Sequence, residues 1–369
     1  MDIRQKEEFE KLPQEGVYAV VDLADAMPAR MKGYDPYKYI DVNITGNLNI
    51  LEYCRKTGAD RILFAQSFGD IKDYAEENPL LTVDLLRKFS FTSDHTIYVM
   101  TKNFAVDMIE NYHQMYGLKH FIFRLPTIYL YSPIDTYYVD GKQRRIGYRL
   151  LIDKEPIEVW GDPNRVKDMV YVKDFCQMLY RAVFADRNCG YYNVGTGTGT
   201  SLLDQIQGMI DVFGTPRKRS RLIMCPDKPN APQYVMDIAP AVAELGYEPE
   251  YNYYKMFLDF KKEMENQSLG WQTPEALSDL YLSDGLGFFL KPVNCLQQIF
   301  KGFQLKECGP CKIDRSPEKD LQQERGKISK RKVGKQGHTA THDNSQKDGR
   351  ENVLKLFQVA VTQKFPVWI

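Results

Sequence analysis

The chain has 369 residues, of which 43% are hydrophobic and 27% charged, and its 49 basic and 49 acidic side chains cancel. This composition is typical of globular proteins and excludes a fully disordered or fibrous chain. No apolar run reaches the roughly 18–20 residues of a membrane span, and the balanced charge gives no indication of a nucleic-acid or membrane partner. The charged first residues and seven scattered cysteines lead us to expect a cytoplasmic protein.

Short apolar runs alternate with amphipathic segments along the first part of the chain. The runs at 17–23, 61–66 and 120–125 are rich in β-branched and aromatic residues, which is typical of buried parallel strands. Between them, segments 37–56 and 97–116 place apolar residues at helical spacing. Strands that alternate with helices of this length predict an α/β fold with a doubly wound parallel sheet covered on both faces.

Shorter elements follow and predict a smaller, mixed α/β lobe. The predicted strands are 157–160, 169–172, 191–194 and 221–225, and the predicted helices lie near 173–186 and 201–214.

The composition divides the chain into three regions. We expect a first domain at 1–150 and a mainly second-lobe region at 151–266, with the chain crossing between the lobes. An extension at 267–369 is left unassigned. Residues 301–350 are rich in Lys, Arg, Gln, Gly and Asp with almost no periodic apolar residues, which predicts a largely disordered tail.

Tyr98 and Lys102 lie four residues apart in a predicted helix, which places both side chains on one face. An ammonium group beside a phenol favours the phenolate, so we expect the pKa of Tyr98 to fall toward neutrality. A tyrosine of this kind can accept and return a hydroxyl proton. The alternative is a chance pair of a core tyrosine and a solvated lysine. Ser67 favours the first interpretation, because it ends a predicted strand and ligands bind at the carboxyl ends of parallel strands.

Further motifs surround these three residues in a fixed order. They are AVVDLADA (19–26) for a D-x-V-x-x-x-A-A run, VNITGN (42–47) for N-x-x-G-T, ILFAQSFGDI (62–71) for a catalytic serine segment, FRLPTIY (123–129) for R-x-x-N-x-Y, VWGDPNRVKDMVYVKDF (159–175) for G-D-G…R-D-x-V-x-V-x-D, YNVGTG (192–197) and LGYEP (245–249). In this series, the chain resembles the extended short-chain dehydrogenases/reductases, specifically the NAD-dependent epimerase/dehydratase family acting on nucleotide sugars. The resemblance covers about residues 2–266.

The resemblance implies a Rossmann-like fold, bound NAD, a nucleotide-sugar substrate and a homodimer. It also implies that the oxidised cofactor takes a hydride from a sugar carbon while Tyr98 takes the hydroxyl proton, Ser67 holds the oxygen and Lys102 holds the nicotinamide ribose. The remaining implied cofactor contacts are Asp2, Ile3, Leu23, Ala24, Asn43 and Pro126. The implied substrate contacts are Thr127, which stands in an Asn place, Lys167, which stands in an Arg place, and Lys228. No metal site is expected.

Three interpretations of the function stay open, and the first is an epimerase or a dehydratase. A keto-sugar intermediate can be reduced again from its other face, as in an epimerase, or can lose water, as in a dehydratase. Phe68 and Gly69 follow Ser67, where a dehydratase normally has acidic residues, so we slightly favour an epimerase. The alternatives are a sugar or carbonyl reductase of the same fold and a non-catalytic remnant or binding module.

The family pattern begins with a strand and a G-x-x-G-x-x-G turn that holds the pyrophosphate, and no such motif occurs before residue 100. We therefore expect a chain lacking the first strands of the fold, whose own activity is in doubt. The strand at 17–23 is then expected to be an edge strand with exposed apolar faces.

Three other motifs are given plain interpretations. The run from Gly195 to Gly199 is spaced as G-x-G-x-G, and we expect a glycine turn with Ser201 as the helix N-cap. The pair Cys308 and Cys311 lacks the strand and helix that a redox motif needs. His338 and His342 lack the glutamate of a zinc-protease motif and belong to a polar tail.

Overall fold

A computed structural model describes residues 1–93, 95–131, 136–139, 142–145, 156–215, 219–230 and 232–266. The expectations for 267–369 lie outside these residues, including the disorder at 301–350, the pair Cys308 and Cys311, and the two histidines His338 and His342. The expected boundary at residue 150 also lies in an undescribed stretch and stays a prediction.

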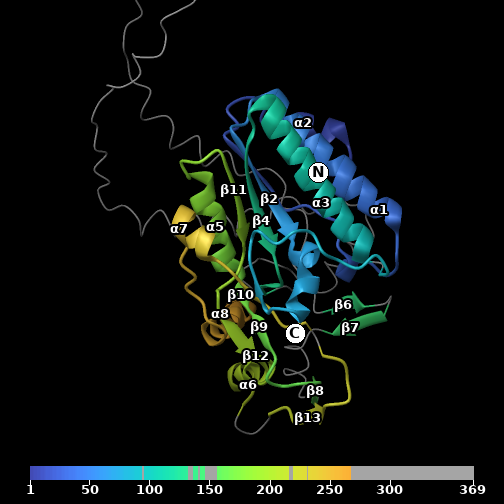
Figure 1. Ribbon diagram of the computed structural model, residues 1–369, viewed down its shortest axis with the longest axis vertical. Helices are drawn as coiled ribbons and strands as arrows, with labels where there is room; N and C mark the ends of the chain where they lie inside the picture. Colours follow the sequence, from blue (N-terminus) through green and yellow to red (C-terminus); the bar gives the residue numbers. More distant parts are fainter. Residues whose placement is uncertain are drawn as a thin grey trace, which may run out of the picture.

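Four parallel strands form the central sheet in the order β1-β2-β4-β11 (Figure 1). They are β1 (Ala19–Asp22), β2 (Arg61–Ser67), β4 (Lys119–Leu125) and β11 (Cys189–Asn193). The first three correspond to predicted strands, which confirms the parallel α/β sheet. We had assigned the fourth, predicted at 191–194, to the second lobe. It pairs with β4 instead, so the chain returns from the second lobe to complete the main sheet.

Helices cover both faces of this sheet (Figure 1). One layer contains α1 (Pro36–Ile40), α2 (Asn47–Thr57) and α3 (His95–Tyr116), and the other contains α5 (Val172–Val183) and α7 (Ala239–Leu245). Successive strand residues point to opposite faces, so Val20 joins the core under the first layer and Val21 joins the core under the second. This is the doubly wound arrangement that the alternating pattern predicted.

β1 lies at the end of the described sheet, as expected, but its predicted exposure is wrong. All four residues of the strand are buried, and Val20 and Asp22 have no exposed surface. The reason is that the two helical layers extend over β1, so both of its faces pack in a core.

The predicted helix at 37–56 is interrupted by a wider turn. Asp35 caps its start by accepting the backbone amides of Tyr37 and Lys38. Residues Asp41–Gly46 are π-helical and join α1 to α2 without a break. The helix ends at Gly58, whose φ of 68° is the left-handed conformation that favours glycine. Single π turns often lie at functional sites.

The remaining described strands form short pairs, and two further helices, α6 (Leu202–Phe213) and α8 (Tyr253–Asn266), pack against each other in the second lobe (Figure 1). The strand pairs are β8 (Ile157–Trp160) with β13 (Leu222–Cys225), β9 (Val166–Asp168) with β12 (Gly199–Ser201), β10 (Val170–Tyr171) with β5 (Ile128–Tyr129), β14 (Val235–Met236) with β3 (Leu80–Leu81), and β6 (Thr136–Val139) with β7 (Lys142–Arg145). Turns of 3-10 helix occupy Lys6–Lys11, Pro28–Arg30, Phe68–Asp70 and Lys72–Glu76. Among the described helices, none has the length and apolarity needed to cross a membrane.

Candidate active site

The three predicted catalytic residues share one site, grouped around a carboxylate. Ser67 ends β2, and its side chain lies near the Tyr98 phenol, where it acts to lower the phenol's pKa. Tyr98 Oη donates a 3.0 Å hydrogen bond to Asp25 Oδ2. Lys102 Nζ lies 3.7 Å from the same oxygen, and its side chain is almost completely buried. Proton-exchanging groups therefore meet beyond the carboxyl ends of β1 and β2, where a parallel sheet binds its ligands.

The pKa of Tyr98 is raised well above its ordinary value, so the expected fall toward neutrality is wrong. Burial is the largest cause, and the negative charge of Asp25 is the next. The Lys102 ammonium is directed to Asp25 and lies 4.3 Å from the centre of the Phe64 ring. The lysine is thus paired with a carboxylate, and the phenol faces that same negative charge.

Asp25 is the site residue that the sequence analysis did not single out. It follows β1 by three residues and is 7% exposed. A signal was present, since the run AVVDLADA was matched to a pattern ending in two alanines and Asp25 departs from that pattern. A charged residue in a place suited to a small apolar one is a marker of function, because burying a charge costs free energy unless it is paired.

Asn43 lies in the π-helical turn, and its side chain forms hydrogen bonds with other residues of the chain. Its Oδ1 accepts the backbone amide of Ala26 at 2.6 Å. Its Nδ2 donates to the Ala26 carbonyl at 3.3 Å and to Thr101 Oγ1 at 3.0 Å. Asn43 therefore ties the loop that carries Asp25 to the helix that carries Lys102. Its predicted cofactor contact stays a prediction.

The other predicted cofactor contacts are placed less directly. Leu23, Ala24 and Pro126 are buried after the ends of their strands. Both carboxylate oxygens of Asp2 are bonded by the Arg4 guanidinium, which lowers the pKa of Asp2. Ile3 packs on the π-helical turn so closely that a Cβ on Gly46 would lie 2.5 Å from its Cδ1.

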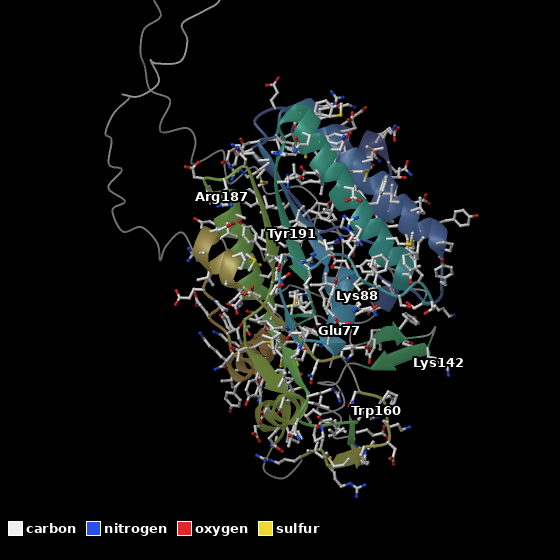
Figure 2. All side chains as sticks on the ribbon, in the orientation of Figure 1. Glu77, Lys88, Lys142, Trp160, Arg187 and Tyr191 are labelled. Carbon is white, nitrogen blue, oxygen red and sulfur yellow. The ribbon has the colours of Figure 1, made fainter. Side chains whose placement is uncertain are left out.

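Two of the three predicted substrate contacts lie near one another. Lys167 Nζ lies 5.6 Å from the ring centre of Tyr129 and 5.9 Å from that of Tyr234, and burial lowers its pKa to about 8. Thr127 lies near the buried Tyr234 phenol and opposes the rise of its pKa that burial causes. Lys228 is exposed, with its ammonium 5.3 Å from the ring centre of Trp160, which Figure 2 shows in the lower lobe. The structure does not bring Lys228 into contact with the other two.

The glycine turn after β11 is organised by a buried carboxylate. Asp168 accepts the amides of Thr196 at 2.9 Å, Gly197 at 3.2 Å and Met236 at 3.2 Å. Ser201 caps α6, as predicted, by accepting the amide of Asp204. The amides that a phosphate could use are thus directed to a side chain of the protein, which supports the plain interpretation of this turn.

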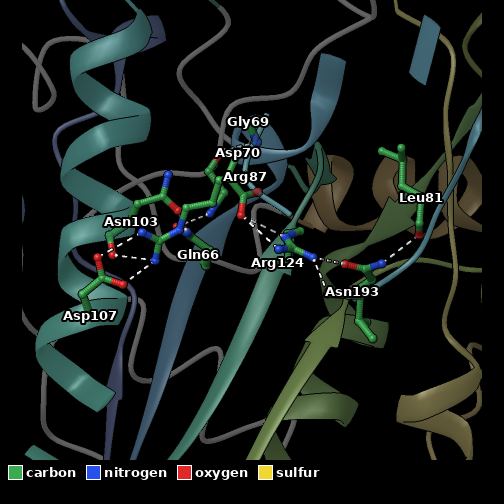
Figure 3. Close-up of polar contacts among 11 residues, drawn as sticks. Gln66, Gly69, Asp70, Leu81, Arg87, Asn103, Asp107, Arg124 and Asn193 are labelled. Atoms are coloured by element: carbon green, nitrogen blue, oxygen red, sulfur yellow. Dashed lines mark hydrogen bonds and ion pairs between the residues drawn. The ribbon is translucent and has the colours of Figure 1, made fainter. Parts of the chain in front are cut away.

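A polar network holds the segment after Ser67 (Figure 3). Arg124 Nη2 pairs with Asp70 Oδ2 at 3.0 Å, and both side chains are buried. Gln66 Oε1 accepts the Ser67 amide at 2.8 Å, and Gln66 Nε2 donates to Asn103 Oδ1 at 2.9 Å. These contacts join β2, β4 and α3, so Ser67 is held on a rigid support.

The comparison with known proteins agrees with this geometry. A sequence model described as the NAD dependent epimerase/dehydratase family matches residues 1–195. The chain belongs to this family. The predicted resemblance, the enzyme class and NAD as the cofactor of the family are thereby confirmed.

Several similar proteins are named as enzymes that act on nucleotide sugars. A putative UDP-glucose 4-epimerase of Methanocaldococcus jannaschii is 29% identical over 276 residues, which are 73% of this chain and 77% of that protein. A UDP-glucuronate 4-epimerase of Thermodesulfobacterium geofontis is 27% identical over 63% of this chain and 68% of its own length. The solved UDP-glucose 4-epimerase of Thermotoga maritima, with UDP-glucose, has a TM-score of 0.58 and 22% identity, and the match covers 72% of this chain and 84% of that one. This last likeness confirms the Rossmann-type fold.

The residues at the ends of β1 and β2 suit the nicotinamide half of the cofactor. The Lys102 ammonium and the hydroxyls of Ser67 and Tyr98 are donors of the kind that bind ribose and substrate hydroxyls. The Asp25 carboxylate is an acceptor beside them. Asp2, a predicted cofactor contact, is already engaged by Arg4, so the fit rests on the residues at the ends of β1 and β2.

Proposed function

We propose that this chain catalyses NAD-dependent epimerisation of a nucleotide sugar through a keto-sugar intermediate. The observation that carries the proposal is the meeting of Ser67, Tyr98 and Lys102 at the carboxyl ends of the parallel strands. When bound, the cofactor supplies hydride transfer to and from the sugar carbon. The protein supplies the path for the proton and holds the reacting oxygen.

In this proposal, each residue has one task. Tyr98 Oη exchanges the proton of the sugar hydroxyl. Ser67 Oγ donates to the same sugar oxygen and orients it. Lys102 binds the hydroxyls of the nicotinamide ribose. The cofactor contacts proposed for Asp2, Ile3, Leu23, Ala24, Asn43 and Pro126 line the rest of its path.

The sugar nucleotide is proposed to enter from the second lobe. Thr127 is partly exposed at the end of β4 and faces the sugar. Lys167 and Lys228 bind the diphosphate as point charges, which lack the bidentate geometry of arginine. Relatives named for UDP-glucose and UDP-glucuronate support a uridine diphosphate sugar.

The environment of Asp70 supports an epimerase over a dehydratase. It is the first acidic residue after Ser67, and a dehydratase needs an acid that can protonate a leaving hydroxyl. Asp70 is 1% exposed, and its carboxylate is paired with Arg124. It is therefore withdrawn from the site. The reductase of the same fold remains the second candidate, since it needs the same three residues without the return of the hydride.

A homodimer is proposed through the layer of α1, α2 and α3. Apolar side chains recur there at helical spacing with more than a third of their surface exposed: Ile40, Leu48, Met100 and Phe104. Exposed apolar surface of this kind marks interaction sites. A second copy of the chain is the proposed partner.

The experiment has two stages. Purified protein is mixed with NAD, and its thermal unfolding is followed. At a ligand concentration of one hundred times Kd, binding stabilises the folded state by about 2.7 kcal/mol. The protein is then incubated with UDP-glucose or UDP-glucuronate, and the 4-epimer is sought by chromatography. Binding without turnover of either sugar supports the binding-module alternative, and absence of both contradicts the proposal.

A further inference from the structure

Asp25 and Tyr98 form a donor–acceptor pair inside the proposed site. The 3.0 Å distance from Tyr98 Oη to Asp25 Oδ2 fixes the phenolic proton between the two oxygens, because a carboxylate can only accept. The two residues are 73 positions apart, so the contact is made by the fold and not by local sequence.

Lys102 forms an ion pair with Asp25 beside the hydrogen bond from Tyr98. Its Nζ is 3.7 Å from the same Asp25 oxygen, so the ammonium stabilises the carboxylate charge. The Asp25 side chain is 10% exposed and that of Lys102 is 2% exposed. Buried charged groups are stabilised when they are paired, so this lysine is the electrostatic partner of Asp25 beside the phenol.

The loop that carries Asp25 is held on both sides. On one side, Asn43 accepts a hydrogen bond from the amide of Ala26, the residue after Asp25, and donates one to the Ala26 carbonyl. On the other side, Asn43 donates to the hydroxyl of Thr101, the residue before Lys102. Thr101 Oγ1 donates in turn to the Tyr98 carbonyl at 2.8 Å. The distance from Asp25 to Tyr98 is therefore fixed by a connected set of buried contacts.

Other polar groups face the phenol. The side chain of Ser67, from β2, acts to lower the pKa of the phenol, and the ring centre of Tyr39 in α1 lies 6.3 Å from that of Tyr98. Lys102 and Asp25 both act electrostatically on Asp22, at the end of β1. Among these neighbours in the described structure, Asp25 alone combines a negative charge with a hydrogen bond to the phenolic oxygen.

We infer that Asp25 is a positioning residue that accepts, through Tyr98, the proton released by the sugar hydroxyl. When the sugar is oxidised, its hydroxyl proton passes to Tyr98 Oη, and the proton that Tyr98 held passes to Asp25 Oδ2. The hydride, with its two electrons, goes to the oxidised dinucleotide. The phenol ends as it began and the carboxylate is neutralised. Reduction of the ketone returns both protons along the same path. This inference rests on the proposed function.

The first test examines the contact between Asp25 and Tyr98 through the ionisation of the phenol, in the absence of cofactor and sugar. Asp25→Asn keeps an oxygen that can accept from the phenol but removes the charge. The phenolate absorbance of Tyr98 is taken as the difference from the matched Tyr98→Phe protein, over the pH range in which circular dichroism shows a folded chain. We expect the midpoint to fall by about 1–3 pH units in Asp25→Asn. Asp22→Asn is the control, since it removes a nearby buried carboxylate that does not touch the phenol, and it should shift the midpoint less. An unchanged midpoint in Asp25→Asn overturns the inference.

The second test reads the proton path during turnover. Asp25→Asn should lower kcat by about 100-fold or more with little change in KM, and Asp25→Glu should restore part of the loss. Equal or faster turnover in Asp25→Asn overturns the inference, whereas absence of turnover in the wild type overturns the proposed function. The two failures are therefore distinguishable.

Discussion

Arg124 and Asp70 form an ion pair that is buried at the carboxyl ends of β4 and β2 (Figure 3). Arg124 also reaches Asn193 Oδ1 at 3.4 Å, and Asn193 donates to the Leu81 carbonyl at 2.8 Å. The guanidinium thus links two neighbouring strands, β4 and β11, to the segment after Ser67. A substitution at Arg124 or Asp70 is therefore expected to affect the candidate site by moving the segment that follows Ser67.

Loss of this ion pair should be costly. Arg124→Met leaves the Asp70 carboxylate buried without its cation, and we expect the free energy of unfolding to fall by about 3–5 kcal/mol. The double variant with Asp70→Asn removes both charges and should recover much of that loss. Urea unfolding of both variants measures the difference. A single variant within 1 kcal/mol of the wild type would contradict the assignment.

Tyr98→Phe should abolish turnover and leave cofactor binding nearly intact. The phenol exchanges the proton in the proposed reaction, and the ring retains its packing near Tyr39. We expect kcat to fall by about 100-fold or more. Chromatographic detection of the epimer gives the rate, and the thermal shift with NAD gives the binding. Turnover at the wild-type rate would remove Tyr98 from the reaction.

Asp22 should make the protein less stable as the pH rises. Burial raises the pKa of Asp22 from 3.8 to about 6, so the native state holds this proton more tightly than the unfolded chain. The stabilising contribution is complete below pH 3.8 and is lost as the pH rises through 6. A difference of roughly two pKa units corresponds to about 3 kcal/mol.

The matched variant is Asp22→Asn, which can still accept the Ala24 amide. We expect it to be more stable than the wild type at pH 7.5 by on the order of 3 kcal/mol. The gain should shrink toward pH 4. Urea unfolding at the two pH values tests this, and an advantage that does not change with pH would contradict it.

Gly195→Ala should destabilise the turn after β11. A Cβ at this position would lie 2.6 Å from Asp168 Oδ2 and 2.6 Å from Met236 Cβ. The overlap forces the carboxylate away from the amides that it accepts, and we expect a loss of about 1–3 kcal/mol. Gly33→Ala is the control, because no atom lies within 4 Å of its Cβ position. Equal unfolding free energies for the two variants would contradict the packing argument.

Phe104→Glu should prevent the proposed dimer. The side chain is 47% exposed in the middle of α3, within the apolar surface of the first helical layer. A buried unpaired carboxylate disfavours association. Phe184→Glu is a matched control, since Phe184 is also 47% exposed and follows α5 in the other layer. Light scattering should give a monomer for the first variant and a dimer for the second; a monomeric wild type would refute the dimer.

The strands and helices of the first lobe follow directly from the sequence. Their apolar residues repeat with the period of each element, and both faces of the sheet are buried, so pattern and structure coincide. The strand predicted at 191–194 was assigned to the wrong sheet. Strand pairing depends on contacts such as Tyr192 with Phe123, which lie far apart in the chain and leave no local signal.

Ser67, Tyr98 and Lys102 of the candidate site were singled out from the sequence, but Asp25 and the electrostatics of the site were not. The spacing of Tyr98 and Lys102 places them one turn apart, and the structure agrees. The pKa of Tyr98 depends instead on Asp25, which reaches it from a loop 73 residues earlier. Periodicity within a helix contains no information about such a partner, so the predicted direction of the pKa change was wrong.

The hydrogen bonds of Asn43 have a further consequence for ligand binding. Because the turn after β1 is already fixed to α3 in the free chain, little conformational entropy is left to lose there when a ligand arrives. Replacing Asn43 by alanine would release that turn, and each binding event would then have to order it again. The entropy cost of ordering this turn is therefore met once, during folding, and does not weaken each binding event.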